Sequence, residues 1–193
     1  MTSTLPVHVP TAASHAPRLA PLDAEPGLVL RLFNRALRSQ LGKVFTPSRV
    51  IYARFPALLW RQLPLYHLVE RGLSFEPDLR FLIEVQVSRL NGCTFCEDLH
   101  RKAAQLKGRC GDKLAALDDF EHNALFSERE RIALRYVSEI AREGTAADAT
   151  FDRLRAAFSE REIVELTWLQ AFTTYLNRMA VPLGIGSDGF CAL

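Results

Sequence analysis

The 193-residue sequence predicts an all-α protein of about eight helices, and three observations lead to this prediction. Apolar residues recur at steps of three and four over most of the chain, which is the period of an amphipathic helix. Two Ser-Glu-Arg-Glu segments have the form of a capping box at a helix start. No segment alternates apolar and polar residues as a strand does, and no Asn-Gly or Asp-Gly pair joins two such segments.

The chain is predicted to divide into a flexible arm, residues 1–26, and a single all-α domain, residues 27–193. The arm holds five of the ten prolines, mixed with alanine, serine and threonine. Proline at this density opposes helices and sheet ladders, because it fixes φ and lacks a backbone N–H. An arm that docks on a partner or on a neighbouring subunit is the alternative.

Helices of the first half are expected between glycine and proline residues that act as end signals. Residues 28–41 are apolar at helical spacing, and Gly42 follows them. A short helix is expected between Pro47 and Pro56, and a longer one over residues 57–71, where Pro64 interrupts the pattern. Two more helices are expected over residues 79–90 and 93–107, separated by an Asn-Gly turn.

The second half shows clearer helix starts. Ser127 and Ser159 each precede a glutamate by three residues and an apolar periodic segment, so each is expected to cap a helix. Residues 144–150 are expected to form a loop and residues 151–158 a short helix. The apolar segment 163–185 contains Glu, Asn, Arg and Pro, which indicates a buried helix and not a membrane span.

Composition and charge narrow the classes of function. The net charge is +2, from 24 basic and 22 acidic residues, and this balance argues against a nucleic-acid-binding domain. The N-terminus lacks a basic stretch followed by an apolar run, so neither a secretory signal nor a membrane partner is predicted. We expect a cytoplasmic protein in a reducing compartment. There, a close cysteine pair is typical of catalytic or metal-binding sites.

One motif concentrates the chemistry: Cys93 and Cys96, three residues apart, with His100 one turn further on. The preceding Asn-Gly pair places both cysteines at a helix start, where free N–H groups and the helix dipole favour a thiolate. His100 falls on the same stripe as Cys96 and can exchange a proton with it directly or through water. A thiol pair with an acid/base group is what redox or peroxidatic chemistry requires.

Two other interpretations of the motif stay open. The cysteines could be two small buried apolar residues. Alternatively, Cys93, Cys96 and His100, with Cys110, could bind zinc, although the second ligand pair of a usual zinc module is missing. A thioredoxin fold is not expected, because no strand precedes the pair.

Residues 87–96, Val-Ser-Arg-Leu-Asn-Gly-Cys-Thr-Phe-Cys, together with His100, resemble the core of the carboxymuconolactone decarboxylase and alkylhydroperoxidase D superfamily. The segments 127–134 and 158–167, followed by Asn177-Arg178, resemble two later helices of that superfamily. The resemblance covers about residues 45–188 and leaves the proline-rich arm outside.

This resemblance implies an alkylhydroperoxidase D-like helical fold that assembles into homotrimers or hexamers. It implies a thiol-dependent peroxidase or disulfide oxidoreductase, in which Cys96 is peroxidatic, Cys93 resolves its sulfenic acid and His100 belongs to the proton relay. The expected partners are a hydroperoxide substrate and a dithiol or lipoyl-bearing reductant. Neither a cofactor nor a metal is expected.

The chain departs from the family pattern at one site position. The family's relay glutamate falls twelve residues before the first cysteine, where this sequence has Phe81. The nearest acid is Glu84, one turn further along and in an apolar setting, where a carboxylate needs a partner. Glu84 is therefore expected either to serve the relay from a shifted position or to pair structurally with Arg80 or Arg89.

The main expectation is a peroxidase that uses Cys93 and Cys96. A lyase like the decarboxylases of the superfamily is one alternative, but that chemistry does not call for a CxxC pair. A redox-sensing oligomer with little turnover is another, if the missing glutamate reflects lost activity. The fold by itself does not separate these functions.

Overall fold

The computed structural model describes residues 16–191, which are all-helical, as the sequence predicts. No strand occurs in this range. The helices are α1 (Leu28–Leu41), α2 (Pro56–Arg71), α3 (Pro77–Leu90), α4 (Thr94–Leu106), α5 (Gly111–Ala115), α6 (Glu128–Glu143), α7 (Asp148–Ala157) and α8 (Glu160–Ala180). A π-helical turn, η1 (Ser48–Tyr52), precedes α2, and 3-10 turns follow α5 (η2, Leu117–Asp119) and α8 (η3, Val181–Leu183).

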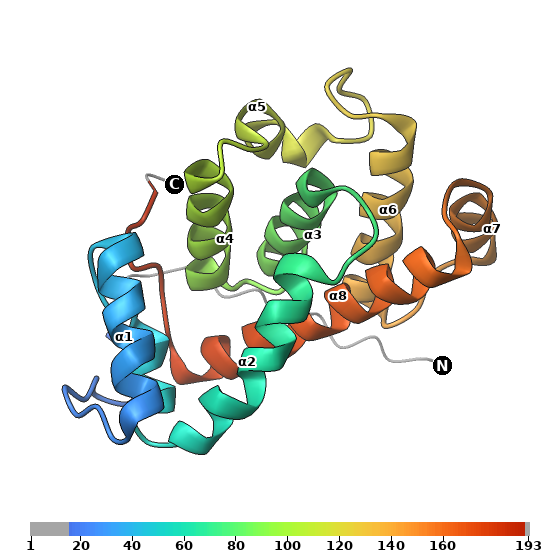
Figure 1. The fold of residues 1–193 in the computed structure, drawn as a ribbon. Coiled ribbons are helices and arrows are strands. Elements are labelled where there is room, and N and C mark those ends of the chain that lie inside the picture. Colours follow the sequence, from blue (N-terminus) through green and yellow to red (C-terminus); the bar gives the residue numbers. More distant parts are fainter. Residues whose placement is uncertain (1–15, 192–193) are drawn as a thin grey trace, which may run out of the picture.

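Helix α3 lies at the centre of the bundle, between α4 and α6, with α8 running across its other side (Figure 1). Every residue from Leu79 to Ser88 is buried, so this helix is surrounded by protein on all sides. Most of these residues are apolar, as is typical of a helix that is buried on all sides. The few polar groups of α3 are therefore buried as well, and each needs a partner inside the fold.

Local capping signals act where the sequence predicts them. Ser127 and Ser159 each accept a hydrogen bond from the N3 backbone N–H, and Glu130 and Glu162 bond back to the cap residues. Both capping boxes are therefore formed. Gly42 ends α1 with a φ of 77°, a left-handed conformation that glycine adopts without steric cost.

Several boundaries differ from the prediction because packing overrides local signals. Helix α2 continues through Pro64, where an interruption was expected. The short helix expected before Pro56 is the π-helical turn η1, and α7 begins at Asp148, three residues before the expected start. The sequence pattern also left the short helix α5 unassigned. Because a proline removes only one intrahelical hydrogen bond, the contacts made by the rest of α2 can stabilise a helix that continues through Pro64.

The expected N-terminal arm is described only from residue 16 onward; residues 1–15 lie outside the described range. Residues 16–26 contain no helix. They nevertheless contact the domain: Arg18 N donates to Leu183 O at 2.9 Å, and Leu22 N donates to Arg49 O at 3.0 Å. This part of the arm is thus held against the bundle by backbone hydrogen bonds.

The C-terminal segment runs back between α1 and α4 (Figure 1). Asp98 of α4 is fully buried and accepts hydrogen bonds from Ser187 Oγ and from the backbone N–H groups of Phe190 and Cys191. Asp188 accepts from Thr46 at the other side of the segment. The segment therefore closes one side of the α1–α4 region.

The outer faces of α1 and α2 carry apolar side chains. Trp60 of α2 is 58% exposed. With it, Leu28, Leu32, Phe55, Leu63 and Leu68 are exposed on the same pair of helices or at their ends. Among the described residues, no helix is both long enough and apolar enough to span a bilayer.

Candidate active site

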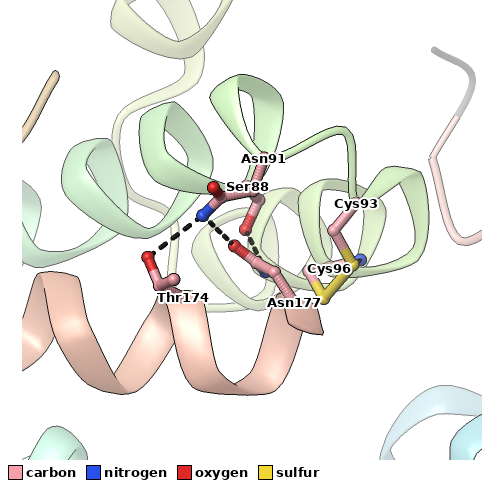
Figure 2. Close-up of a disulfide and its surroundings, with 6 residues drawn as sticks. All are labelled: Ser88, Asn91, Cys93, Cys96, Thr174 and Asn177. Carbon is pink, nitrogen blue, oxygen red and sulfur yellow. Dashed lines mark hydrogen bonds between the residues drawn. A yellow bond between two sulfur atoms is a disulfide. The ribbon is translucent and has the colours of Figure 1, made fainter. Parts of the chain in front are cut away.

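The two cysteines of the motif lie at the start of α4 and form a disulfide (Figure 2). Cys93 is the N-cap residue, and its sulfur accepts a hydrogen bond from Cys96 N at 3.3 Å. Cys96 lies in the first turn, and the two Cα atoms are 5.3 Å apart. Gly92 before them has a φ of 69°, a conformation that favours glycine and lets the chain turn from α3 into α4.

A buried polar network holds this turn against α8 (Figure 2). Asn91 Nδ2 donates to Thr174 Oγ1 at 3.0 Å and to Asn177 Oδ1 at 2.9 Å. Asn177 Nδ2 in turn donates to Ser88 Oγ at 3.3 Å, and Cys93 N donates to Ser88 O at 2.9 Å. A satisfied buried network gives the cysteine pair one fixed position relative to α8.

A cavity of about 590 Å³ opens beside the disulfide, bounded by α1, α2, α3, α4 and α8. Its lining is mostly apolar and includes Phe33, Leu37, Phe45, Phe95, Leu99 and Phe172. Cys96 belongs to this lining, whereas Cys93 lies behind it and is 1% exposed. The two sulfurs are therefore inequivalent, because a molecule in the cavity reaches Cys96 first.

His100 and Glu84 line the same cavity. His100 Nδ1 is 3.4 Å from Glu84 Oε2, although one group comes from α4 and the other from α3. Glu84 is 5% exposed, so its carboxylate is shielded from bulk water. Phe81, at the position of the family glutamate, is also buried and carries no acid/base group. The structure thus brings Cys96, His100 and Glu84 together around one space.

Both partners that the sequence offered for Glu84 can now be located. Arg80 Nε is 3.7 Å from Glu84 Oε2. Arg89 faces elsewhere and pairs with Glu97 at 2.7 Å and with Asp118 at 2.8 Å. Glu84 therefore touches a histidine on one side and an arginine on the other. The i,i+4 spacing of Arg80 and Glu84 was the sequence signal for this pair.

An outer ion pair continues from Arg80 toward the surface. Arg80 Nη1 donates to Glu70 Oε1 at 2.7 Å, and Lys107 also contacts Glu70. Burial by itself would raise the pKa of Glu70, but the hydrogen bonds from Lys107 and Arg80 outweigh it and lower this pKa below its ordinary value. Glu70 stays charged at neutral pH, and the sequence analysis did not identify it.

A second polar group in the cavity wall was also missed. Tyr52 OH donates to Gln62 Oε1 at 3.0 Å and lies 2.8 Å from Tyr66 OH, while Gln62 Nε2 donates to Tyr175 OH at 2.9 Å. Burial raises the pKa of both Tyr52 and Tyr66, so both stay protonated as hydrogen-bonding groups. These residues are distant in sequence from the cysteine motif and belong to no common pattern.

The remaining cysteines lie outside the cavity lining. Cys110 Sγ donates to Asp78 O in the first turn of α3. The cysteine pair follows the other end of this 14-residue helix, which is about 20 Å long. Burial, followed by nearby Asp78, raises the pKa of Cys110 to about 12. Cys110 is thus not placed with Cys93 and Cys96. Within residues 16–191, no three His, Cys, Asp or Glu side chains are grouped as metal ligands would be.

Comparison with known proteins agrees with the fold and the motif. The profile described as the Carboxymuconolactone decarboxylase family matches residues 56–139, which include α3, α4 and the cysteine pair. The uncharacterised protein YnjA of Escherichia coli strain K12 is 29% identical over 177 residues, or 91% of this chain and 96% of the relative.

Two solved structures extend this agreement. A protein of unknown function from Agrobacterium tumefaciens, described as a candidate antioxidant defence protein AhpD, is 30% identical with a TM-score of 0.64. The match covers 72% of this chain and 97% of that one. An uncharacterised peroxidase-related protein from Silicibacter sp. TM1040 is 23% identical, with a TM-score of 0.75 over 91% of this chain and 93% of its own, and supports the fold alone. The chain belongs to the carboxymuconolactone decarboxylase and AhpD-like superfamily.

Proposed function

We propose that this chain is a cysteine-dependent peroxidase, a disulfide oxidoreductase that reduces organic hydroperoxides through Cys96 and Cys93. The observation that carries the proposal is the arrangement of Cys96, His100 and Glu84 around one mostly apolar cavity. The name of the Agrobacterium structure, which mentions antioxidant defence, supports it.

The first step starts from the reduced pair. Cys96 lies in the first turn of α4, where the helix dipole and free N–H groups favour its thiolate. This thiolate attacks one oxygen of the hydroperoxide, and the O–O bond breaks as the S–O bond forms. His100 takes up the proton that the Cys96 thiol releases and returns it to the departing alkoxide, which gives an alcohol and a sulfenic acid on Cys96.

The second step closes the disulfide. The Cys93 thiol attacks the sulfur of the sulfenic acid, the S–S bond forms and the S–O bond breaks, so that the oxygen leaves as water. The two cysteines together lose two electrons, which reduce the peroxide to alcohol and water. A dithiol or lipoyl-type reductant then returns two electrons and two protons to the pair by thiol–disulfide exchange.

The cavity favours an organic substrate over hydrogen peroxide. Its apolar lining would bury the carbon chain or ring of the hydroperoxide, while Cys96 and His100 meet the O–O group. The exposed apolar side chains of α1 and α2 support a homo-oligomer, a trimer or a hexamer, because a face of this kind is stabilised by burial.

The test is consumption of an organic hydroperoxide with a dithiol reductant, with the Cys93–Cys96 bond followed by intact mass. We expect multiple turnovers and a pair that cycles between dithiol and disulfide. A disulfide that forms with peroxide but does not turn over would instead favour a redox-sensing protein. A pair that does not react with peroxide would contradict the proposal and favour a lyase of the decarboxylase type.

A further inference from the structure

Arg80 is a buried cation that the steps above do not use. Its side chain is 6% exposed, and it lines the cavity from α3. Nη1 donates to Val69 O at 3.3 Å and to Glu70 Oε1 at 2.7 Å. Nε is buried and donates to no atom of the described residues; it lies 3.7 Å from Glu84 Oε2. A buried guanidinium is costly unless acceptors surround it, so the carboxylate of Glu84 helps to compensate the buried charge of Arg80.

The ring of Phe81 fixes the orientation of Arg80. The guanidinium lies 4.0 Å from the centre of that ring, a stacked cation–π contact. Phe81 is itself buried in the core. The residue that stands in place of the family glutamate therefore supports an arginine, and that arginine faces the shifted carboxylate of Glu84.

The charges around Glu84 form an alternating row. The order along the row is Lys107, Glu70, Arg80, Glu84 and His100, and each group contacts the next. Tyr52 and Tyr66 add neutral hydroxyl groups from η1 and α2, and the lining residues of α1 and α8 carry no titratable group. Lys107 pairs with Glu70, one step further along the row from Glu84. The permanent cation directly beside Glu84 is therefore Arg80.

The charge of Glu84 determines the proton arrangement on His100. An ionised carboxylate only accepts hydrogen bonds, so His100 Nδ1 must carry the proton that faces Glu84, and Nε2 is left free as a base. A buried carboxylate that loses its cation takes up a proton instead. A protonated Glu84 would then donate to Nδ1, and the imidazole proton would move to Nε2.

We propose that Arg80 is a positioning residue: its guanidinium beside Glu84 favours the carboxylate form there, and that carboxylate holds the His100 proton on Nδ1 and leaves Nε2 free. The consequence for turnover rests on the proposed peroxidase function. The tautomer itself does not, because the contact between His100 Nδ1 and Glu84 is present in the disulfide form described here.

The experiment measures the His100 tautomer by long-range ¹H–¹⁵N NMR on the full chain in its disulfide form, labelled with ¹⁵N-histidine. The His100→Gln variant identifies the signals. We expect the Nδ1–H form to dominate in the unmodified protein at neutral pH. In Arg80→Met, the ratio of Nδ1–H to Nε2–H should fall on the order of tenfold, the effect of about one charge-assisted hydrogen bond. Arg80→Lys should retain most of the ratio because it keeps the charge.

Arg129→Met is the matched control. Arg129 also stacks on a phenylalanine, 3.8 Å from the centre of the Phe158 ring, and pairs with a glutamate, Glu162. It lines no part of the cavity, so its removal should cost stability without changing the His100 ratio. A change of similar size in both variants would mean that Arg80 acts only through general packing, and would overturn the proposal.

An unchanged ratio in Arg80→Met, or a dominant Nε2–H form in the unmodified protein, would also overturn it. If Arg80→Met does not fold, Arg80→Gln carries the same expectation, because it keeps polar groups near Val69 and Glu70 but has no charge. A shifted tautomer in a protein that never consumes peroxide would refute the proposed function and leave the role of Arg80 intact.

Discussion

Glu84 Oε2 lies 3.4 Å from His100 Nδ1 and 3.7 Å from Arg80 Nε, so one buried carboxylate contacts both a histidine and an arginine. The sequence posed a choice between a relay glutamate and a structural ion pair. In the folded chain Glu84 contacts both groups, because Arg80 and Glu84 are one turn apart on α3 and His100 approaches from α4. The ion pair to Arg80 can serve a relay through His100.

The two cysteines should differ in their effect on turnover. Cys96→Ser should abolish peroxide reduction, because only Cys96 lines the cavity. Cys93→Ser should form one sulfenic acid per chain and then stop, since no second thiol closes the disulfide. Peroxide consumption and intact mass after dimedone trapping measure both effects. Turnover that survives in Cys96→Ser, or equal alkylation of the two reduced thiols, contradicts this assignment.

Replacing Glu84 should slow the reaction without unfolding the protein. Glu84→Gln removes the charge that faces His100 Nδ1, and we expect the rate with peroxide to fall on the order of 10²-fold, a typical acid–base contribution. The pH–rate profile should shift in the same variant. Glu97→Gln is the control, because Glu97 is also paired with arginines but does not line the cavity. An unchanged rate with a lower Tm would identify Glu84 as structural only.

Acid should weaken the fold through Glu165 of α8. Burial would raise the pKa of Glu165, but hydrogen bonds from Ser74 and the ion pair with Arg161 outweigh it and hold this pKa below 4.5. A carboxylate whose pKa is lower in the folded state stabilises the fold at every pH above its pKa in the unfolded chain. This stabilisation is lost as the pH falls through the pKa of the folded state. Urea unfolding of Glu165→Gln should show a loss of about 1–3 kcal/mol at pH 7 that shrinks as pH falls below 4.5. A loss that is the same at every pH would contradict this.

The exposed face of α1 and α2 should mediate self-association. Trp60 is 58% exposed, and Trp60→Lys would place a charge among its apolar neighbours. Light scattering at micromolar concentration should show a trimer or hexamer for the unmodified chain and smaller species for this variant. Val164→Lys is the matched control, because Val164 is 67% exposed but belongs to α8 and not to α1 or α2. A monomer in the unmodified protein would refute the expected assembly.

The sequence by itself determined the features that act within a turn or two. The periodicity of the apolar residues predicted an all-helical chain, and the glutamates three residues after Ser127 and Ser159 predicted capping boxes that the fold contains. The Asn-Gly break before Cys93 likewise placed the CxxC pair at a helix start. These signals involve neighbouring residues, so they can be recognised before any helix is packed.

Only the tertiary structure decided which distant side chains meet. It placed His100 against Glu84 and left Trp60 exposed. Helix α2 also continues through Pro64, although a proline by itself predicts an interruption of the helix. These outcomes depend on how helices from separate parts of the chain pack around α3. Each contact across that interface is weak and non-local, so no short sequence pattern encodes it.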